Sequence, residues 1–104
     1  MQRVEELLGK YERVWFYVSE EWRETFYEEL LKINARFRDG SCITHESIRE
    51  FMGVGSDGTV GYVSYMIWYS SFENPSRGRI KVDYGKFRSS EKGYFIDTNI
   101  KVRL

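Results

Sequence analysis

The sequence predicts an α+β domain in which two helices pack on a mixed, mostly antiparallel sheet of about five strands. Two observations lead to this fold class. Apolar residues recur at helical spacing in two N-terminal segments, whereas the second half of the chain is dominated by short β-type runs separated by glycine-containing turns. The length of 104 residues fits one domain, residues 1–104, built around one hydrophobic core.

The first elements are a short helix and a strand. Val4 and Leu7 lie at helical spacing within residues 2–12, which predicts a helix there. Gly9 weakens this helix by about 1 kcal/mol relative to alanine, so we expect tertiary contacts to hold it. Residues 14–18 form a β-type run with apolar side chains on both faces, which is typical of an interior strand covered on both sides.

The second helix is expected over residues 20–33. Ser19 is a suitable N-cap, and Asn34 can end the helix in a left-handed conformation. An apolar stripe predicts the face of this helix that packs on the sheet: Trp22, Phe26, Leu30 and Ile33, with Tyr27 and Leu31 beside them. We expect Trp22 and Phe26 to anchor the helix to the sheet. A brief strand at residues 36–38 then completes a β–α–β unit over residues 14–38.

A hairpin is predicted in the middle of the chain. Residues 48–54 are interpreted as a strand, with a short helix begun by Thr44 as the alternative. The sequence Ser56-Asp57-Gly58 supplies the hairpin turn. Residues 59–69 are rich in β-branched and aromatic side chains and are predicted to be the longest strand. Their second half, from Tyr65, has a helical turn as its alternative.

The last third of the chain carries turn signals between short runs. A loop is predicted over residues 74–78, where Asn-Pro stands before Ser-Arg-Gly. Polar and apolar residues alternate over 79–84, which predicts a half-exposed antiparallel strand. A further loop is expected over residues 89–93. One or two short closing strands are expected at residues 94–96 and 100–103.

The composition excludes several function classes. The 16 basic and 16 acidic residues give a formal net charge of zero, which argues against a nucleic-acid binder driven by global charge. The single cysteine, Cys42, permits no intramolecular disulfide, and acidic residues stand where a secretory leader would be apolar. We therefore expect a cytoplasmic protein. The apolar stretch of residues 60–69 is about half a membrane span, so no membrane partner is expected.

No set of residues for catalysis or metal binding is recognised. Cys42 and His45 form a Cys-x-x-His pair, but a structural zinc site needs four ligands and no second pair exists. No family motif surrounds this pair that would indicate a nucleophile. Gly53, Gly55 and Gly58 match a dinucleotide-binding pattern by letter, but β-type residues follow where a helix must begin. We expect no catalytic residue, no metal ligand and no cofactor.

The aromatic content indicates binding. The 3 Trp, 8 Tyr and 7 Phe exceed what a small core hides, and exposed aromatic side chains are typical of binding faces. Tyr65 and Trp68 are candidate anchors for a protein partner, although Trp68 also suits the core. Tyr84, Lys86 and Arg88 combine a ring with positive charge, which suits a nucleotide or single-stranded nucleic acid. Lysine is also common at solvated strand edges, where it discourages aggregation, and this is the alternative explanation for the basic residues.

Four runs carry a likeness to other proteins: Asp57-Gly58-Thr59-Val60-Gly61-Tyr62-Val63-Ser64, Met66-Ile67-Trp68, Ser71-Phe72 and Val82-Asp83-Tyr84-Gly85-Lys86-Phe87. They resemble a group of short uncharacterised proteins of gut-dwelling Gram-positive bacteria and their phages and mobile elements. Val14-Trp15-Phe16-Tyr17, Phe26 and Phe37-x-Asp39-Gly40 fit the same group, so the resemblance covers most of the chain. It implies a genomic setting and no activity. Small proteins of such elements are often inhibitors of host defence, which is an analogy and not a property of these residues.

Two hypotheses from different classes follow. The first is a small non-enzymatic binding protein, as would suit a phage inhibitor of a bacterial defence system, which acts by covering a partner protein's surface. The alternative is a module that binds a small ligand, a nucleotide or single-stranded nucleic acid. An enzyme centred on Cys42 and His45 is the least favoured interpretation, because neither residue has the partners that its chemistry needs.

Overall fold

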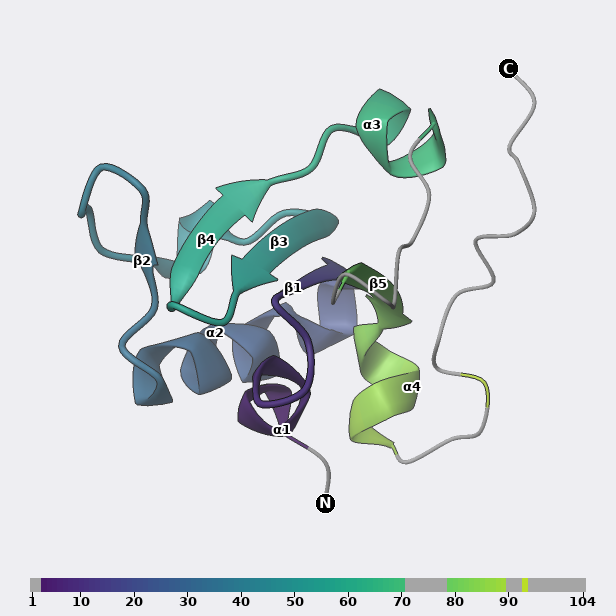
Figure 1. Ribbon diagram of the computed structural model, residues 1–104, viewed down its shortest axis with the longest axis horizontal. Coiled ribbons are helices and arrows are strands. Elements are labelled where there is room, and N and C mark those ends of the chain that lie inside the picture. The colour runs from purple at the N-terminus through teal and green to yellow at the C-terminus, as the bar shows by residue number, and fades with distance from the viewer. Residues whose placement is uncertain (1–2, 71–78, 90–92, 94–104) are drawn as a thin grey trace.

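The computed structural model describes residues 3–70, 79–89 and 93, and it has the predicted α+β architecture (Figure 1). The strands form one mixed five-stranded sheet in the order β2-β4-β3-β1-β5. The strands are β1 (Arg13–Tyr17), β2 (Arg36–Phe37), β3 (Phe51–Gly55), β4 (Thr59–Tyr62) and β5 (Arg79–Asp83). The helices are α1 (Val4–Leu8), α2 (Arg23–Lys32), α3 (Tyr65–Ser70) and α4 (Tyr84–Arg88), with 3₁₀ turns η1 (Glu20–Trp22) and η2 (His45–Ser47).

Strand β1 lies inside the sheet, as its apolar residues on both faces predict. It pairs antiparallel with β3 on one side and parallel with β5 on the other, while β4 pairs antiparallel with β3 and parallel with β2. These pairings make β1 and β2 run in the same direction, joined by α2. The β–α–β unit is therefore present, but β3 and β4 lie between its two strands.

The main core lies between the sheet and the helices α1, α2 and α4, which Figure 1 shows below the sheet. The register places Phe16 opposite Met52 on β3 and opposite Val82 on β5, and all three side chains are fully buried. Phe26 of α2 packs edge-on against Phe16, with ring centroids 5.2 Å apart. Burying large apolar side chains is the main favourable term in folding, so this layer stabilises the domain.

The predicted stripe on α2 is correct at its centre and too wide at its edges. Phe26 and Leu30 are buried, and Trp22 and Ile33 are half-buried against the core. Leu31 is exposed, because it lies on the solvent side of the helix. The helix begins later than expected, since residues 20–22 form η1. Asn34 has φ 55°, the left-handed conformation expected after the helix end.

The hairpin prediction is confirmed from Phe51 onward. Strand β3 covers Phe51–Gly55, and Gly58 has φ 85°, a conformation that glycine adopts at little cost. The alternative of a helix begun by Thr44 is realised only as the single turn η2, in which Thr44 and Ser47 form a capping box. Strand β4 follows the three glycines, so the context that a dinucleotide-binding loop needs is absent here.

Two strand predictions are wrong. The long strand expected over residues 59–69 stops at Tyr62, and α3 follows, which is the helical alternative from Tyr65. Residues 79–83 form a strand, but it pairs parallel with β1, and Ile80, Lys81 and Val82 are all buried. The alternation of polar and apolar residues predicted a half-exposed strand because it assigned Lys81 to solvent.

The remaining differences concern the ends of the chain. Helix α1 ends at Leu8, with Gly9 as its C-cap, so it is shorter than residues 2–12. Helix α4 was not predicted; Asp83 caps it by accepting a hydrogen bond from the backbone N–H of Lys86 at 3.2 Å. The predicted loop at 74–78 and the closing strands at 94–96 and 100–103 lie outside the described residues.

Gly85 allows α4 to approach Trp22 of η1 closely. A Cβ atom at Gly85 would lie 2.7 Å from the indole nitrogen of Trp22, whose ring is held edge-on against Tyr84. Overpacking costs about 1–3 kcal/mol, and replacing glycine by alanine in a helix returns up to about 1 kcal/mol. We expect Gly85→Ala to lower the free energy of unfolding, as measured by urea denaturation.

Gly61→Ala is the matched control for Gly85→Ala. A Cβ atom at Gly61 would meet no heavy atom within 4 Å, so this variant should be at least as stable as the parent protein. Equal stability of the two variants would show that Gly85 is not required for the packing of α4 on Trp22.

Candidate functional site

The predicted site residues fall into two groups on opposite faces of the sheet. Tyr65 and Trp68 lie on α3, which Figure 1 shows above the sheet, whereas the other three lie on α4 below it. Tyr65 is exposed and Trp68 is buried. The residues Tyr84, Lys86 and Arg88 are buried, exposed and half-buried respectively. The structure therefore does not bring the five residues together into one site.

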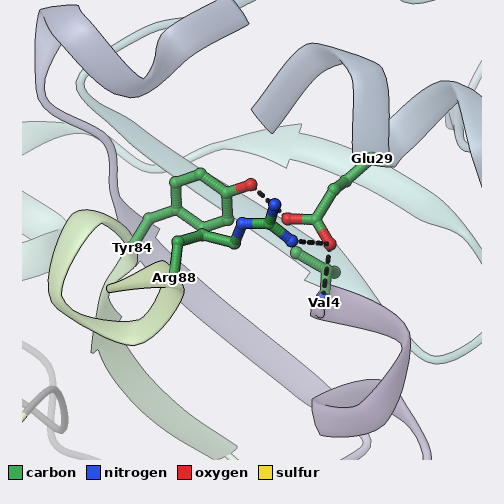
Figure 2. Close-up of polar contacts among 4 residues, drawn as sticks. All are labelled: Val4, Glu29, Tyr84 and Arg88. Carbon is green, nitrogen blue, oxygen red and sulfur yellow. Dashed lines mark hydrogen bonds and ion pairs between the residues drawn. The ribbon is translucent and has the colours of Figure 1, made fainter. Parts of the chain in front are cut away.

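Tyr84 and Arg88 meet at a buried carboxylate, as Figure 2 shows. The hydroxyl of Tyr84 donates a hydrogen bond to Glu29 Oε2, and Arg88 Nη1 lies 3.5 Å from Glu29 Oε1. The backbone N–H of Val4 donates to the same Oε1 at 2.9 Å. Glu29 therefore joins α1, α2 and α4 through one carboxylate, and Tyr84 has no ring face available to stack on a ligand.

Glu29 also supplies the cap that α1 lacks locally. Arg3 occupies the N-cap position and makes no side-chain capping hydrogen bond. Val4 is the first residue of α1, and its N–H points to the Glu29 carboxylate from α2. A carboxylate near a helix N-terminus is favourable both as a hydrogen-bond acceptor and toward the helix dipole. Such a contact stabilises a helix that is too short to persist alone.

A pocket of about 160 Å³ lies beside this cluster. Arg3, Lys32 and Arg88 contribute positive charge to its lining, and Glu5 and Glu28 contribute negative charge together with Glu29. Because the two signs are mixed, the lining has no net preference for an anion such as phosphate. The Glu29 cluster is best explained as a structural contact among three helices.

The environment of Tyr84 predicts a pH dependence of stability. Burial raises the pKa of Tyr84 well above its ordinary value of 10.0, and the hydrogen bond to Glu29 acts in the same direction. The folded protein therefore keeps a proton that the unfolded chain releases at high pH. This contribution to stability is fully present below about pH 10 and is lost as the pH rises further.

We expect the free energy of unfolding to fall more steeply above about pH 10 in the parent protein than in Tyr84→Phe. Burial and the neighbouring Tyr65 also raise the pKa of Tyr69, so part of the decline should remain in the variant. Urea titrations at a series of pH values measure both slopes. Parallel slopes for the two proteins would contradict the assignment to Tyr84.

Cys42 and His45 contact different neighbours. Arg36 Nη1 donates to Cys42 Sγ at 2.7 Å, whereas the centroid of the His45 ring lies 4.0 Å from that of the Tyr27 ring. Within residues 3–70, 79–89 and 93, no group of three or more His, Cys, Asp or Glu side chains is placed to hold a metal ion. In the same part of the chain, no helix has both the length and the apolar character needed to cross a membrane.

The inner side of α3 is fixed to the sheet by Trp68. Its ring stacks on Phe51 of β3, with centroids 4.6 Å apart, and on Trp15 of β1 at 6.3 Å. Lys81 of β5 lies over both tryptophan rings, 5.3 Å from Trp68 and 5.9 Å from Trp15, and its Nζ donates to the Trp68 carbonyl oxygen. Stacking and cation–π contacts of this kind hold a short helix in a defined orientation.

The outer side of α3 presents large apolar side chains to solvent. Tyr65, Met66 and Ile67 are 63%, 66% and 49% exposed, and we call these three residues the α3 face. Ser64 begins the helix, since its Oγ accepts a hydrogen bond from the N–H of Ile67 at 3.1 Å. Successive residues of a helix are turned by about 100°, so the three side chains leave α3 in different directions. The Tyr65 ring lies toward the sheet beside Trp68, with its centroid 6.0 Å from that of Phe51.

Sequence reasoning found Tyr65 but missed Met66 and Ile67. The strand predicted over residues 59–69 would bury alternate residues. A signal for the helix was present, because Tyr65, Trp68 and Tyr69 recur at positions i, i+3 and i+4. The Tyr65 and Tyr69 rings do pack together, with centroids 4.4 Å apart.

Comparison with protein-family models, with curated proteins and with solved structures finds no match to this chain. The candidate site therefore rests on geometry. The α3 face combines high exposure with large apolar side chains, and Trp68 attaches the same helix to the sheet by stacking on Phe51. Apolar patches with these properties are typical of protein contact sites.

Proposed function

We propose that this chain is a small non-enzymatic binding protein that acts by protein–protein contact through the α3 face. The observation that carries the proposal is the exposure of three consecutive large apolar residues, Tyr65, Met66 and Ile67, on a helix that Trp68 anchors. Burying such side chains against a partner is favourable. Because Trp68 already fixes the helix, little conformational entropy is lost on binding.

The chemistry around α3 favours a protein over a nucleic acid or a membrane as partner. Residues 58–72 contain no Asp, Glu, Lys, Arg or His. Contacts with phosphates depend on lysine and arginine, and helices that lie on membranes carry basic residues beside their apolar face. An uncharged apolar face with tyrosine and methionine has the composition of the centre of a protein interface.

The identity of the partner follows from the resemblance described above and not from the geometry. Small proteins of phages and mobile elements often inhibit host defence, so we propose a bacterial defence protein as the target. Inhibition by covering a surface requires no catalytic group on this chain.

Site-specific photocrosslinking tests this function. A photoreactive residue at position 66, on the α3 face, should capture a partner protein in bacterial cells, whereas the same residue at position 31 should not. Leu31 is a matched control because it is also a large apolar residue, 48% exposed, but lies on α2. Capture of the same proteins from both positions would show that the α3 face has no specific role.

A substitution provides the second arm of this test. Ile67→Glu should abolish capture of the specific partner, because a charged side chain in the centre of an apolar interface is costly to desolvate. Leu31→Glu, which adds the same charge elsewhere, should leave capture unchanged. Undiminished capture by Ile67→Glu would overturn the proposal.

A further inference from the structure

Three tyrosine rings pack around Phe51, where α3 meets one end of β1 and β3. The ring centroids of Tyr17, Tyr65 and Tyr69 lie 5.7, 6.0 and 6.2 Å from that of Phe51. The rings of Tyr65 and Tyr69 also pack on each other, with centroids 4.4 Å apart. Tyr65 is exposed, whereas Tyr17 and Tyr69 are half-buried and Phe51 is buried. We call these four residues the tyrosine cluster.

Negative charge is concentrated at the tyrosine cluster. The face of an aromatic ring carries partial negative charge, and the exposed Glu50, next to Phe51 in the chain, adds a carboxylate. Burial raises the pKa of Tyr69, and the neighbouring tyrosines and Glu50 act in the same direction. Such surroundings disfavour an anion such as phosphate and favour a cation.

An exposed tyrosine elsewhere in the sheet already holds a cation. The guanidinium carbon of Arg49 lies 5.7 Å from the ring centroid of Tyr62, which is 54% exposed. Tyr65 is exposed to a similar extent, at 63%, but no lysine or arginine of the described segments lies over its ring. The tyrosine cluster is therefore suited to a cation that a second molecule brings.

We propose that the tyrosine cluster binds an arginine side chain of the partner protein, with the guanidinium placed against Tyr65 and Tyr69 and close to Glu50. The inference rests on the proposed function, because it names the group that the partner brings to α3. A guanidinium is planar, stacks on aromatic rings and is more weakly hydrated than a lysine ammonium. Arginine is also enriched in protein interfaces, whereas lysine is depleted.

The tyrosine cluster borders the α3 face, since Tyr65 belongs to both. Met66 and Ile67 offer exposed apolar surface, and Glu50 adds an exposed charge beside it. Protein interfaces commonly have an apolar centre and a polar rim, and charges at the rim mainly affect the rate of association. We therefore expect the partner to place an apolar patch on Met66 and Ile67 and an arginine next to that patch.

Titration of the purified full chain, followed by nuclear magnetic resonance, tests the site. The probe is acetyl-arginine amide, which should shift the ring signals of Tyr65 and Tyr69 with a dissociation constant on the order of 1–10 mM, as suits one exposed cation–π site. Acetyl-citrulline amide, which has nearly the same shape without charge, should bind about fivefold more weakly or less. Acetyl-lysine amide should also bind more weakly than the arginine probe.

Matched substitutions locate the site. Tyr65→Leu removes the ring but keeps an apolar side chain, and it should weaken binding of the arginine probe about fivefold. Tyr62→Leu removes another exposed tyrosine and should leave binding unchanged. Glu50→Gln should weaken binding about two- to fivefold. Glu46→Gln, which removes an exposed carboxylate elsewhere, should have no effect.

Several results would overturn the inference. These are an arginine probe that shifts no signal of the tyrosine cluster, a citrulline or lysine probe that binds equally well, a Tyr65→Leu variant that binds normally, and a Tyr62→Leu variant that is equally impaired. The unfolding midpoint of each variant shows whether its fold is retained. If Tyr65→Leu proves unfolded, Glu50→Gln decides instead, because normal binding by that variant also overturns the inference.

Photocrosslinking at position 66 separates this inference from the proposed function. Capture of a partner at position 66 by a protein that binds no arginine probe overturns the inference alone. Binding of the arginine probe without any capture contradicts the proposed function and supports only the chemistry assigned to the tyrosine cluster.

Discussion

Glu29→Ala is expected to lower the free energy of unfolding by about 3–5 kcal/mol, because removing one member of a buried ion pair leaves its partners without compensation. The change would take from Arg88 its ion pair at 3.5 Å, from the Tyr84 hydroxyl its acceptor, and from Val4 N–H its cap. Since small domains have a total stability of about 5–15 kcal/mol, the variant should lose between a fifth and all of its free energy of unfolding.

Glu28→Ala is the matched control for Glu29→Ala. The two residues are adjacent on α2, but Glu28 is exposed, so its loss should change stability by no more than about 0.5 kcal/mol. Glu29→Gln should be intermediate, since the amide oxygen still accepts a hydrogen bond while the ion pair is lost. Urea denaturation monitored by circular dichroism measures all three. Equal effects at positions 28 and 29 would refute the role assigned to the cluster.

Trp68→Ala is expected to cost about 3–5 kcal/mol, the usual range for truncating a buried tryptophan. Trp68 is 3% exposed and provides the contacts of α3 with Phe51 and Trp15. Without this ring, Lys81 also loses one of the two tryptophans over which it lies. We therefore expect α3 to detach from the sheet, with loss of the near-ultraviolet dichroism that stacked tryptophans produce.

Ile67→Ala is the control for Trp68→Ala, because it truncates the neighbouring residue on the exposed side of the same helix. Its effect on stability should stay within about 0.5 kcal/mol. The pair also separates stability from binding. Trp68→Ala should weaken contacts made by the α3 face although that face is unchanged in sequence, because the helix is no longer held in place. A Trp68→Ala protein with the parent's unfolding midpoint would disprove the anchoring role.

Local sequence determined the elements whose signals are short-range. The periodic apolar residues around Phe26 and Leu30 specify α2, because a helix brings residues four apart to one face. Gly58 and Asn34 adopt positive φ angles that few other residues tolerate, so the hairpin turn and the end of α2 are encoded at single positions. The interior placement of β1 followed from apolar residues on both of its faces.

Tertiary structure decided the elements whose local signal was ambiguous. The aromatic and β-branched residues after Thr59 favour a strand by propensity, yet the chain forms α3 from Tyr65 because this places Trp68 on Phe51 and Trp15. Propensity differences amount to about 1 kcal/mol, whereas burying a tryptophan contributes several times more. Packing therefore outweighs the local preference for a strand. The candidate site exists because this segment forms a helix.

Whether the predicted ligand-binding residues on α4 are exposed depends on tertiary contacts, which no sequence pattern specifies. Tyr84 combines an apolar ring with a hydroxyl. A tyrosine at this position therefore suits either an exposed binding face or the core. Its partner Glu29 lies 55 residues away in the chain, and nothing local to either residue specifies their contact. The sequence by itself determined which segments are helical or extended wherever one periodicity prevailed. Only the fold decided which aromatic and charged side chains are buried, because burial depends on which distant segments pack together.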